Sequence, residues 1–443
     1  MSKGQLWETR PLEFWAKAKE LRAGWQNSIE SKEKVIAQGN TFGTMNCDWS
    51  AAFPALSLVE DNPVGSMMQS TNGPFARKAR LACEIRGWGR EICGYQGNCW
   101  GAQFLGYLED GAPFPRRQLV VPMPATCDQH IKRGAQVRDF ENVPQWSGDK
   151  FVYIGPFDPG RNDPMLEHRV YCNLRMVNDI ERIFGQRFDE ETIVTLMRAS
   201  DEIVEYNKEI TLLMARTIPS PLSVKDLYSV YTLGGLTRID PYVALEFWKT
   251  VRDEIKWRAE NQIAAVGNER FRWIEAHPPS WHYLKYYRYM EQYGAVCLGS
   301  EYVHGYASGM EFRPDGSIGF RETMAYPGDT EVATREDAVR YATGPDARIP
   351  DTGAAGEVLY RDPIVTFAKI MQADGALLPV WRHGQGCTMM RKEHGMYLKE
   401  AGLSVMHYEG SQPGERTDLD EKRLLDQLDA WMQSLGFRPF SES

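Results

Sequence analysis

Short apolar runs alternate with helical patterns over the carboxy-terminal part of the chain, and this alternation constrains the fold more than any other feature. Runs at 295–300, 376–381 and 403–408 have the length and apolar character of buried strands. Helical spacing of apolar residues fills the intervals and returns in a final amphipathic helix over 418–435. Strands that alternate with helices predict a parallel sheet with right-handed crossovers. We therefore expect an α/β fold.

The length of the chain indicates more than one domain, because 443 residues exceed one ordinary hydrophobic core. The predicted fold class is α/β, with two Rossmann- or flavodoxin-like parallel-sheet domains joined by a helical segment, plus a helical N-terminal region. Short apolar runs near 118–122 and 150–154 provide strands for the first of these domains. The predicted regions are a helical N-terminal region (1–74), a first α/β domain (75–165), a helical bridging segment (166–266) and a second α/β domain (267–443).

Composition excludes several broad classes of protein. The formal net charge of −9, without a basic stripe, argues against a nucleic-acid partner. No apolar run approaches the ~18–20 residues of a membrane span, so we expect no membrane association. The first residues lack the apolar stretch of a signal peptide, and a cytoplasmic location is expected.

Three of the eight cysteines stand in segments suited to a shared metal centre. Cys127 and Cys387 each follow a strand-like run and a brief turn, and Cys93 lies in Arg-Glu-Ile-Cys-Gly. Ligands collect at the carboxyl ends of strands in open α/β sheets. Because no Cys-x-x-Cys is present, such a centre would be assembled from distant segments. Four other cysteines are expected to pack as small buried hydrophobic groups: Cys47, Cys83, Cys172 and Cys297.

Several familiar catalytic motifs are absent from the sequence. It contains no Gly-x-x-x-x-Gly-Lys-Ser/Thr, no Gly-x-Gly-x-x-Gly after a strand, no His-Glu-x-x-His and no Gly-x-Ser-x-Gly. Nucleotide hydrolysis, Rossmann-type hydride transfer, zincin hydrolysis and α/β-hydrolase chemistry therefore lose support. An enzyme of this sequence would carry its chemistry on a bound cluster.

The cysteine segments resemble those of the superfamily of 2-hydroxyacyl-CoA dehydratases and class I (ATP-dependent) benzoyl-CoA reductases. Arg-Gly-Trp-Gly-Arg-Glu-Ile-Cys93-Gly-Tyr-Gln is similar to the first cysteine segment of that family, and Thr-Cys127-Asp-Gln-His-Ile-Lys to its Thr-Cys-Asp-Gly-Lys signature. His-Gly-Gln-Gly-Cys387 resembles its late Asn-Arg-Ser-Cys-Lys segment. The resemblance extends over most of the chain from about residue 80 and is strongest to the larger cluster-binding subunit of benzoyl-CoA reductase.

This resemblance implies a [4Fe–4S] cluster held between two α/β domains by Cys93, Cys127 and Cys387. It also implies a related smaller cluster-binding subunit, ATP-hydrolysing activator subunits, ferredoxin as upstream donor and an acyl-CoA substrate. The chain departs from the pattern at Val303, where many members carry a further cysteine. Cys99 is then the leading candidate for a fourth ligand, and an open iron position is the alternative.

Three histidines close to these segments are candidate catalytic groups. His130, His304 and His383 each have the chemistry to donate a proton or hydrogen-bond a cluster sulfur, and a purely structural role is the other interpretation of each. The aromatic stretch 281–293 is expected to be a core helix, with the wall of an aromatic acyl pocket as the alternative. The charged run 335–340 is expected to be a solvent-exposed helix face.

The function expected from the resemblance is that of an oxidoreductase subunit, which passes single electrons from a low-potential [4Fe–4S] cluster to an aromatic acyl-CoA of the benzoyl-CoA type. Two alternatives stand beside it. One is a component of an (R)-2-hydroxyacyl-CoA dehydratase that removes water through a ketyl radical. The other is a non-catalytic electron-relay or scaffold subunit whose sister chain holds the substrate.

Overall fold

The computed structural model contains mixed α/β structure with parallel sheets, which confirms the predicted class at that level. The division into two Rossmann-like domains remains a prediction. The described residues are 6–30, 35–38, 52–53, 56–59, 73–89, 92, 94–109, 111–114, 118–120, 128–145, 159–230, 233, 240–275, 279–280, 283–300, 302–307, 310–312, 315, 318–320, 332–348, 361–380, 391–410 and 421–440.

A four-stranded parallel sheet forms the carboxy-terminal part of the fold, in the order β5-β4-β8-β9. The strands predicted near 295–300, 376–381 and 403–408 are confirmed within one residue at each end. The four strands of the sheet are β4 (Phe271–Glu275), β5 (Ala295–Ser300), β8 (Gly375–Val380) and β9 (Ser404–Glu409).

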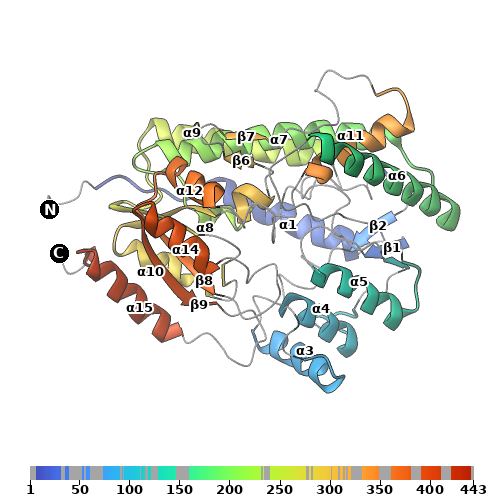
Figure 1. The fold of residues 1–443 in the computed structure, drawn as a ribbon, viewed down its shortest axis with the longest axis horizontal. Helices are drawn as coiled ribbons and strands as arrows, with labels where there is room; N and C mark the ends of the chain where they lie inside the picture. The colour runs from blue at the N-terminus through green and yellow to red at the C-terminus, as the bar shows by residue number, and fades with distance from the viewer. Residues whose placement is uncertain are drawn as a thin grey trace.

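Side chains alternate between the two faces of the sheet along each strand, and buried apolar residues lie on both faces. Helices therefore cover both faces (Figure 1). Trp273 and Leu377 belong to a core that also contains side chains of α10 and α15. Ile274 and Leu378 point to the opposite core, against α12 and α14. The bounds of these helices are α10 (Lys285–Glu291), α12 (Arg361–Ile370), α14 (Arg391–Glu400) and α15 (Glu421–Ser434).

The amino-terminal part, predicted as a helical region over 1–74, contains strands as well as a helix. It contains α1 (Phe14–Glu30), but also the strands β1 (Val35–Gln38) and β2 (Leu56–Val59). β1 is central and pairs in parallel with β2 and with β3 (Leu119–Val120), in the order β2-β1-β3. Runs of four residues are too short for periodicity to reveal, and these two are fixed as strands by pairing with each other and by the pairing of β1 with β3. The strand predicted near 150–154 lies outside the described residues.

Three helices follow in the amino-terminal half: α3 (Gly73–Ile85), α4 (Gly94–Leu105) and α5 (Asp128–Glu141). The backbones of α3 and α4 approach closely, since a Cβ placed on Gly101 would lie 2.0 Å from the carbonyl oxygen of Ala79. A larger residue at this position would push the two helices apart.

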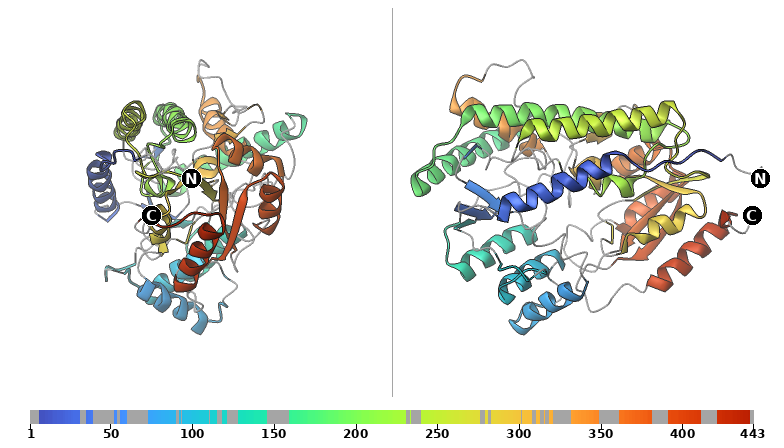
Figure 2. Two further views of the ribbon diagram at one scale, coloured as in Figure 1. Left: turned by 90° about the vertical axis from the view of Figure 1, so that its left-hand side faces the viewer. Right: turned by 180° about the vertical axis from the view of Figure 1, so that it is seen from behind.

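The middle of the chain is helical, as predicted for 166–266. The long helices α7 (Glu190–Arg216) and α9 (Pro241–Glu260) lie side by side along one edge of the molecule (Figure 1). Helix α1 runs beside α9, as the view from behind shows (Figure 2). The other elements of this segment are α6 (Pro159–Phe184) and α8 (Val224–Leu227).

The remaining elements connect β5 to the last helices. They are the π-helix η5 (Tyr302–Ala307), the antiparallel pair β6 (Met310–Phe312) and β7 (Ile318–Phe320), and α11 (Arg335–Arg348). Within the part of the chain that the structure describes, no helix is long and apolar enough to cross a membrane.

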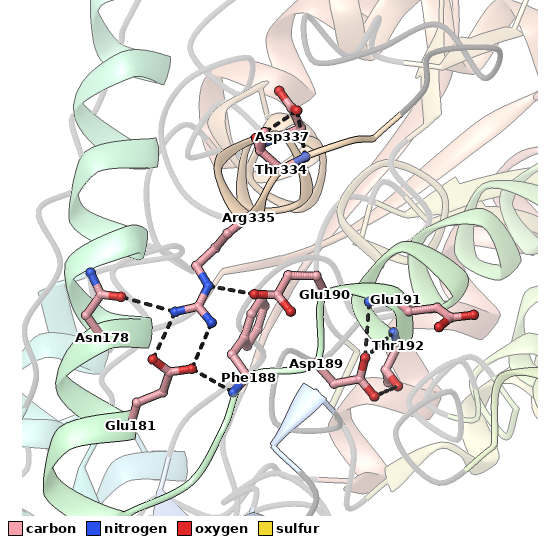
Figure 3. Close-up of polar contacts among 10 residues, drawn as sticks. All are labelled: Asn178, Glu181, Phe188, Asp189, Glu190, Glu191, Thr192, Thr334, Arg335 and Asp337. Atoms are coloured by element: carbon pink, nitrogen blue, oxygen red, sulfur yellow. Dashed lines mark hydrogen bonds and ion pairs between the residues drawn. The ribbon is translucent and has the colours of Figure 1, made fainter.

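Helix α11 begins with the charged run that the sequence predicts to face solvent, and this prediction is wrong for Arg335. Its guanidinium donates to Glu190 at 2.6 Å and to Glu181 at 2.9 Å, so it joins the first turn of α11 to α6 and α7 (Figure 3). We call Arg335, Glu181 and Glu190 the Arg335 junction. The helix also buries apolar side chains between the same two helices: Ala338, Val339 and Ala342.

Candidate functional site

The carboxyl edge of the four-stranded sheet is the candidate functional site. The chain passes from β4 to β5 on one side of the sheet and then to β8 and β9 on the other. The direction in which successive strands are added to the sheet therefore reverses between β4 and β8. Ligands of open α/β sheets bind at such a reversal. Glu275 ends β4 at this point, and the segment 381–390, which contains His383 and Cys387, follows β8 in the sequence.

Glu275 is fully buried and accepts hydrogen bonds from three phenol groups. Its Oε1 accepts from Tyr228 and Tyr287, and its Oε2 accepts from Tyr286 at 3.2 Å. Tyr228 caps α8, whereas Tyr286 and Tyr287 are consecutive residues of α10. We call these four residues the Glu275 cluster.

Burial controls the electrostatics of this cluster. It raises the pKa of Glu275 to about 7, although the three phenol hydrogen bonds act in the opposite direction. Burial also raises the pKa of Tyr228, Tyr286 and Tyr287, and the nearby charge of Glu275 adds to that effect. The tyrosines are thus held as neutral donors, while the carboxyl group titrates in the neutral range.

His304 is placed by η5, immediately beyond the carboxyl end of β5. It is fully buried, and its Nδ1 lies 3.1 Å from the hydroxyl of Thr211 on α7. Its Nε2 has no hydrogen-bond partner among the residues that the structure describes. Burial lowers the pKa of His304 to about 4, so the imidazole is neutral at physiological pH.

The three predicted cluster ligands, Cys93, Cys127 and Cys387, lie outside the described residues. In the sequence, Cys93 and Cys127 directly precede α4 and α5, and Cys387 stands four residues before α14. Helix N-termini present N–H groups and a partial positive charge, which favour thiolates over thiols. The bounds of these helices are thus compatible with a thiolate donor set.

Cys99 is the one predicted cluster residue that the structure describes. It is fully buried in α4, at helical spacing from Gln103, which donates to Glu141 of α5 at 2.8 Å. Cys99 thus shares the face of α4 that turns toward α5. Its role as a ligand stays a prediction, because no group of three or more metal-binding side chains occurs among the described residues.

Of the four cysteines expected to be small buried groups, Cys83 and Cys297 are buried, Cys172 is half-buried and lies 3.4 Å from Nε2 of His168, and Cys47 lies outside the described residues. The thiol of Cys83 donates to the carbonyl oxygen of Gly97 at 3.0 Å, and burial raises its pKa to about 12. Cys297 is buried beside the Glu275 cluster, and burial raises its pKa as well. Neither has the character of a thiolate ligand.

The remaining candidate histidines are not tested by this geometry. His383 lies outside the described residues, and His130 belongs to α5 but its side chain is likewise outside them. Their catalytic roles remain predictions.

Sequence reasoning missed Glu275 as a site residue. The available signal is a single acidic residue at the end of the run Phe-Arg-Trp-Ile-Glu, followed eleven residues later by adjacent tyrosines. The aromatic stretch 281–293 was expected to pack in the core, and Tyr286 and Tyr287 do so. Their hydroxyl groups explain how a carboxyl group can be buried beneath that helix.

Comparison with known proteins identifies the family. The family model for the 2-hydroxyglutaryl-CoA dehydratase D-component matches residues 83–435. The chain is also similar to the (R)-2-hydroxyisocaproyl-CoA dehydratase alpha subunit of Clostridioides difficile, with 24% identity over 303 residues. The aligned region covers 65% of this chain and 69% of that protein. The chain therefore belongs to the 2-hydroxyglutaryl-CoA dehydratase D-component family, within the predicted superfamily.

Proposed function

We propose that this chain is a subunit of an (R)-2-hydroxyacyl-CoA dehydratase. The observation that carries the proposal is the family match over 83–435, a range that contains Cys93, Cys127 and Cys387. The similar Clostridioides difficile protein is named as a dehydratase subunit, and this favours the dehydratase over the benzoyl-CoA reductase that the sequence alone suggests. The corresponding reaction class is a lyase-type dehydration rather than a net reduction.

In this proposal Cys93, Cys127 and Cys387 would hold a [4Fe–4S] cluster, with Cys99 or an open position as the fourth site. The cluster, when bound, supplies one electron at a time. Dehydration of a 2-hydroxyacyl thioester removes hydroxide from C2 and a proton from C3, so the chain's own residues must accept and return a proton. His304, His130 and His383 are the proposed proton-handling groups.

The neutral state of His304 defines what that residue would contribute. A neutral imidazole has one donor and one acceptor nitrogen, and its contact with Thr211 occupies only Nδ1. The buried Nε2 is the nitrogen that we propose to meet a bound acyl group. Because the pKa is lowered by burial, His304 would act without adding positive charge to the site.

The proposed partners are a related second subunit and an ATP-hydrolysing activator, with ferredoxin as the electron source. A heteromeric assembly is supported by the similar protein, which is itself an alpha subunit. The absence of phosphate-binding motifs in this sequence is compatible with a separate activator.

The test is substrate screening of the anaerobically purified chain with its partner subunit, with titanium(III) as reductant. Mass spectrometry distinguishes loss of water from a 2-hydroxyacyl-CoA from gain of hydrogen by benzoyl-CoA. Loss of water supports the proposal. Hydrogen gain by benzoyl-CoA, with the hydroxyacyl thioesters unchanged, would replace it with the reductase.

Matched serine variants test the cluster ligands. Cys127→Ser should lose iron, sulfide, visible absorption and turnover together, because a hydroxyl is a poor iron ligand compared with a thiolate. Cys83→Ser is the control, since a serine hydroxyl can still donate to the carbonyl of Gly97. Full iron content in Cys127→Ser would contradict the ligand assignment.

A further inference from the structure

We propose that Glu275, with the phenol groups of Tyr228, Tyr286 and Tyr287, forms a proton-binding centre at the carboxyl edge of the four-stranded sheet. The proton is its ligand: the carboxylate takes up one proton to become a neutral acid and releases it again. This inference adds a site to the proposed function, and its occurrence does not depend on the dehydratase assignment.

The first argument is the lack of a compensating cation. Glu275 forms no ion pair with any lysine or arginine of the described chain, and it is completely buried. A buried carboxylate without a cation pays a large desolvation cost, which favours its protonated form.

The second argument is the number of donors. Two phenol groups meet at Oε1 and a third reaches Oε2, and hydrogen bonds to a charged group are stronger than those to a neutral one. These donors favour the carboxylate and oppose the cost of burial. The two opposing effects leave the protonated and ionised forms close in free energy, and this is the property that a proton-binding centre requires.

Among the described residues, the titratable groups that face the cluster are uncharged. They are Tyr408 of β9, whose ring centroid is 5.9 Å from that of Tyr286, and Cys297 of β5. Lys225 of α8, whose charge acts on Cys297, forms an ion pair with Glu291. Burial raises the pKa of Tyr408 and Cys297, so both stay neutral and Glu275 is the group that titrates.

A second buried carboxyl group in the same part of the fold provides a matched control. Glu269, which stands just before β4, lies 3.1 Å from the guanidinium of Arg272 and accepts from the backbone N–H of Ser220 at 2.6 Å. Burial and the tertiary setting are similar, but a cation is present. Burial raises the pKa of Glu269 as well, but the N–H of Ser220 and the guanidinium of Arg272 act in the opposite direction, so we expect Glu269 to hold its charge more firmly than Glu275.

Under the proposed dehydratase function, such a centre would suit a reaction that takes a proton from C3 and combines it with the hydroxide leaving C2. Glu275 would pass from carboxylate to carboxylic acid and back, and no electron enters or leaves the cluster of residues. This role rests on the proposed function. The proton binding itself can be measured on the chain without substrate.

The experiment is infrared difference spectroscopy of the full chain as a function of pH, with glutamate labelled at the side-chain carbon. We expect a carboxylic acid carbonyl band that grows as the pH is lowered from about 8 to about 6. The band should be absent in Glu275→Gln and retained in Glu269→Gln. A wild-type chain without the band in this range, or a band that persists in Glu275→Gln, would overturn the proposal.

Tyr286→Phe keeps the proposal testable if Glu275→Gln does not fold. This variant retains the carboxyl group but removes one donor that favours the carboxylate, so the midpoint of the band should move to higher pH by roughly one unit. An unchanged midpoint would show that the phenol groups do not set the proton affinity. Failure of the dehydratase assay with this titration intact would count against the proposed function alone.

Discussion

The Glu275 cluster and the Arg335 junction both remove carboxyl groups from full contact with solvent, but they compensate the negative charge by different means. In the junction, a guanidinium pairs with Glu181 and Glu190 at the partly exposed meeting point of three helices (Figure 3). In the cluster, neutral phenol groups surround one fully buried carboxyl group. The comparison indicates that a cation fixes a carboxylate as charged, whereas neutral donors in an apolar core leave its protonation adjustable.

Glu275→Leu should have the largest effect on stability. It removes the acceptor of three buried phenol groups, and each unpaired buried hydroxyl costs about 1–3 kcal/mol, so we expect a loss of about 3–5 kcal/mol in the apparent free energy of unfolding. Urea denaturation at neutral pH measures it. Glu275→Gln, which keeps an acceptor oxygen, should lose less than half as much. Equal losses in the two variants would show that packing, rather than hydrogen bonding, holds the cluster together.

The two regions should respond to pH in opposite directions, and this is the sharpest form of the comparison. The folded-state pKa of Glu275 is raised by burial to about 7, above that of an unfolded glutamate. Protonation of Glu275 therefore stabilises the fold fully below about pH 4.5, and this contribution, roughly 3 kcal/mol, is lost as the pH rises to about 7.

Glu181 behaves in the reverse way. Burial acts to raise its pKa, but hydrogen bonds from Arg335 and from the N–H of Phe188 outweigh this, so the pKa is lowered overall. Its contribution is present above the ordinary glutamate pKa and is lost as the pH falls through the lower folded-state value. Thermal unfolding across this range should show both slopes, and Glu275→Gln should remove the one between about pH 4.5 and about pH 7. A wild-type slope retained by that variant would contradict the assignment to Glu275.

Arg335→Met should have a smaller effect, about 1–2 kcal/mol, because the junction is partly exposed to solvent. The variant retains much of the apolar stem but leaves Glu181 and Glu190 without their shared cation. Repulsion between them is screened by salt, so the loss should shrink when the urea titration is repeated at high ionic strength. The loss in Glu275→Leu should not change with salt, since the cluster is buried and its donors are neutral.

These differences also explain what the sequence reveals. Strands β5 and β8 are buried runs of largely apolar residues, and β9 mixes apolar with polar residues and is only partly buried, but the local pattern predicts all three. β2 depends on pairing with β1, and β1 also pairs with β3, which lies far along the chain, so no local pattern contains these partners. The ion pairs of Arg335 could not be predicted for the same reason, because its partners are on other helices, about 150 positions away.

The residues of the candidate site also differ in whether the sequence alone identifies them. His304 was singled out because it lies close to a segment with a family resemblance, and the fold adds its burial and its contact with Thr211. Glu275 carried no such motif, and its partners come from α8 and α10 rather than from its own strand. A buried carboxyl group becomes recognisable only once the tertiary structure shows which hydroxyl groups surround it.

Asp189→Ala should have the smallest effect and tests how far the junction extends. Asp189 caps α7 by accepting from the N–H groups of Glu191 and Thr192, both at 3.1 Å, and loss of such a cap costs about 1 kcal/mol. The first turn that it holds carries Glu190, a partner of Arg335 (Figure 3). Fraying of that turn should therefore weaken the junction as well.

A double-mutant cycle separates these contributions. If the cap orients Glu190, Asp189→Ala and Arg335→Met together should cost less than the sum of the single losses, by about 0.5 kcal/mol or more. Asp189→Ser is the control, since serine is also a good capping residue and should restore most of the stability and the full effect of Arg335→Met. Strict additivity of the alanine variant would mean that the cap and the junction stabilise α7 independently. In that case the cap would hold the first turn of α7 without contributing to the charge pairing at Arg335.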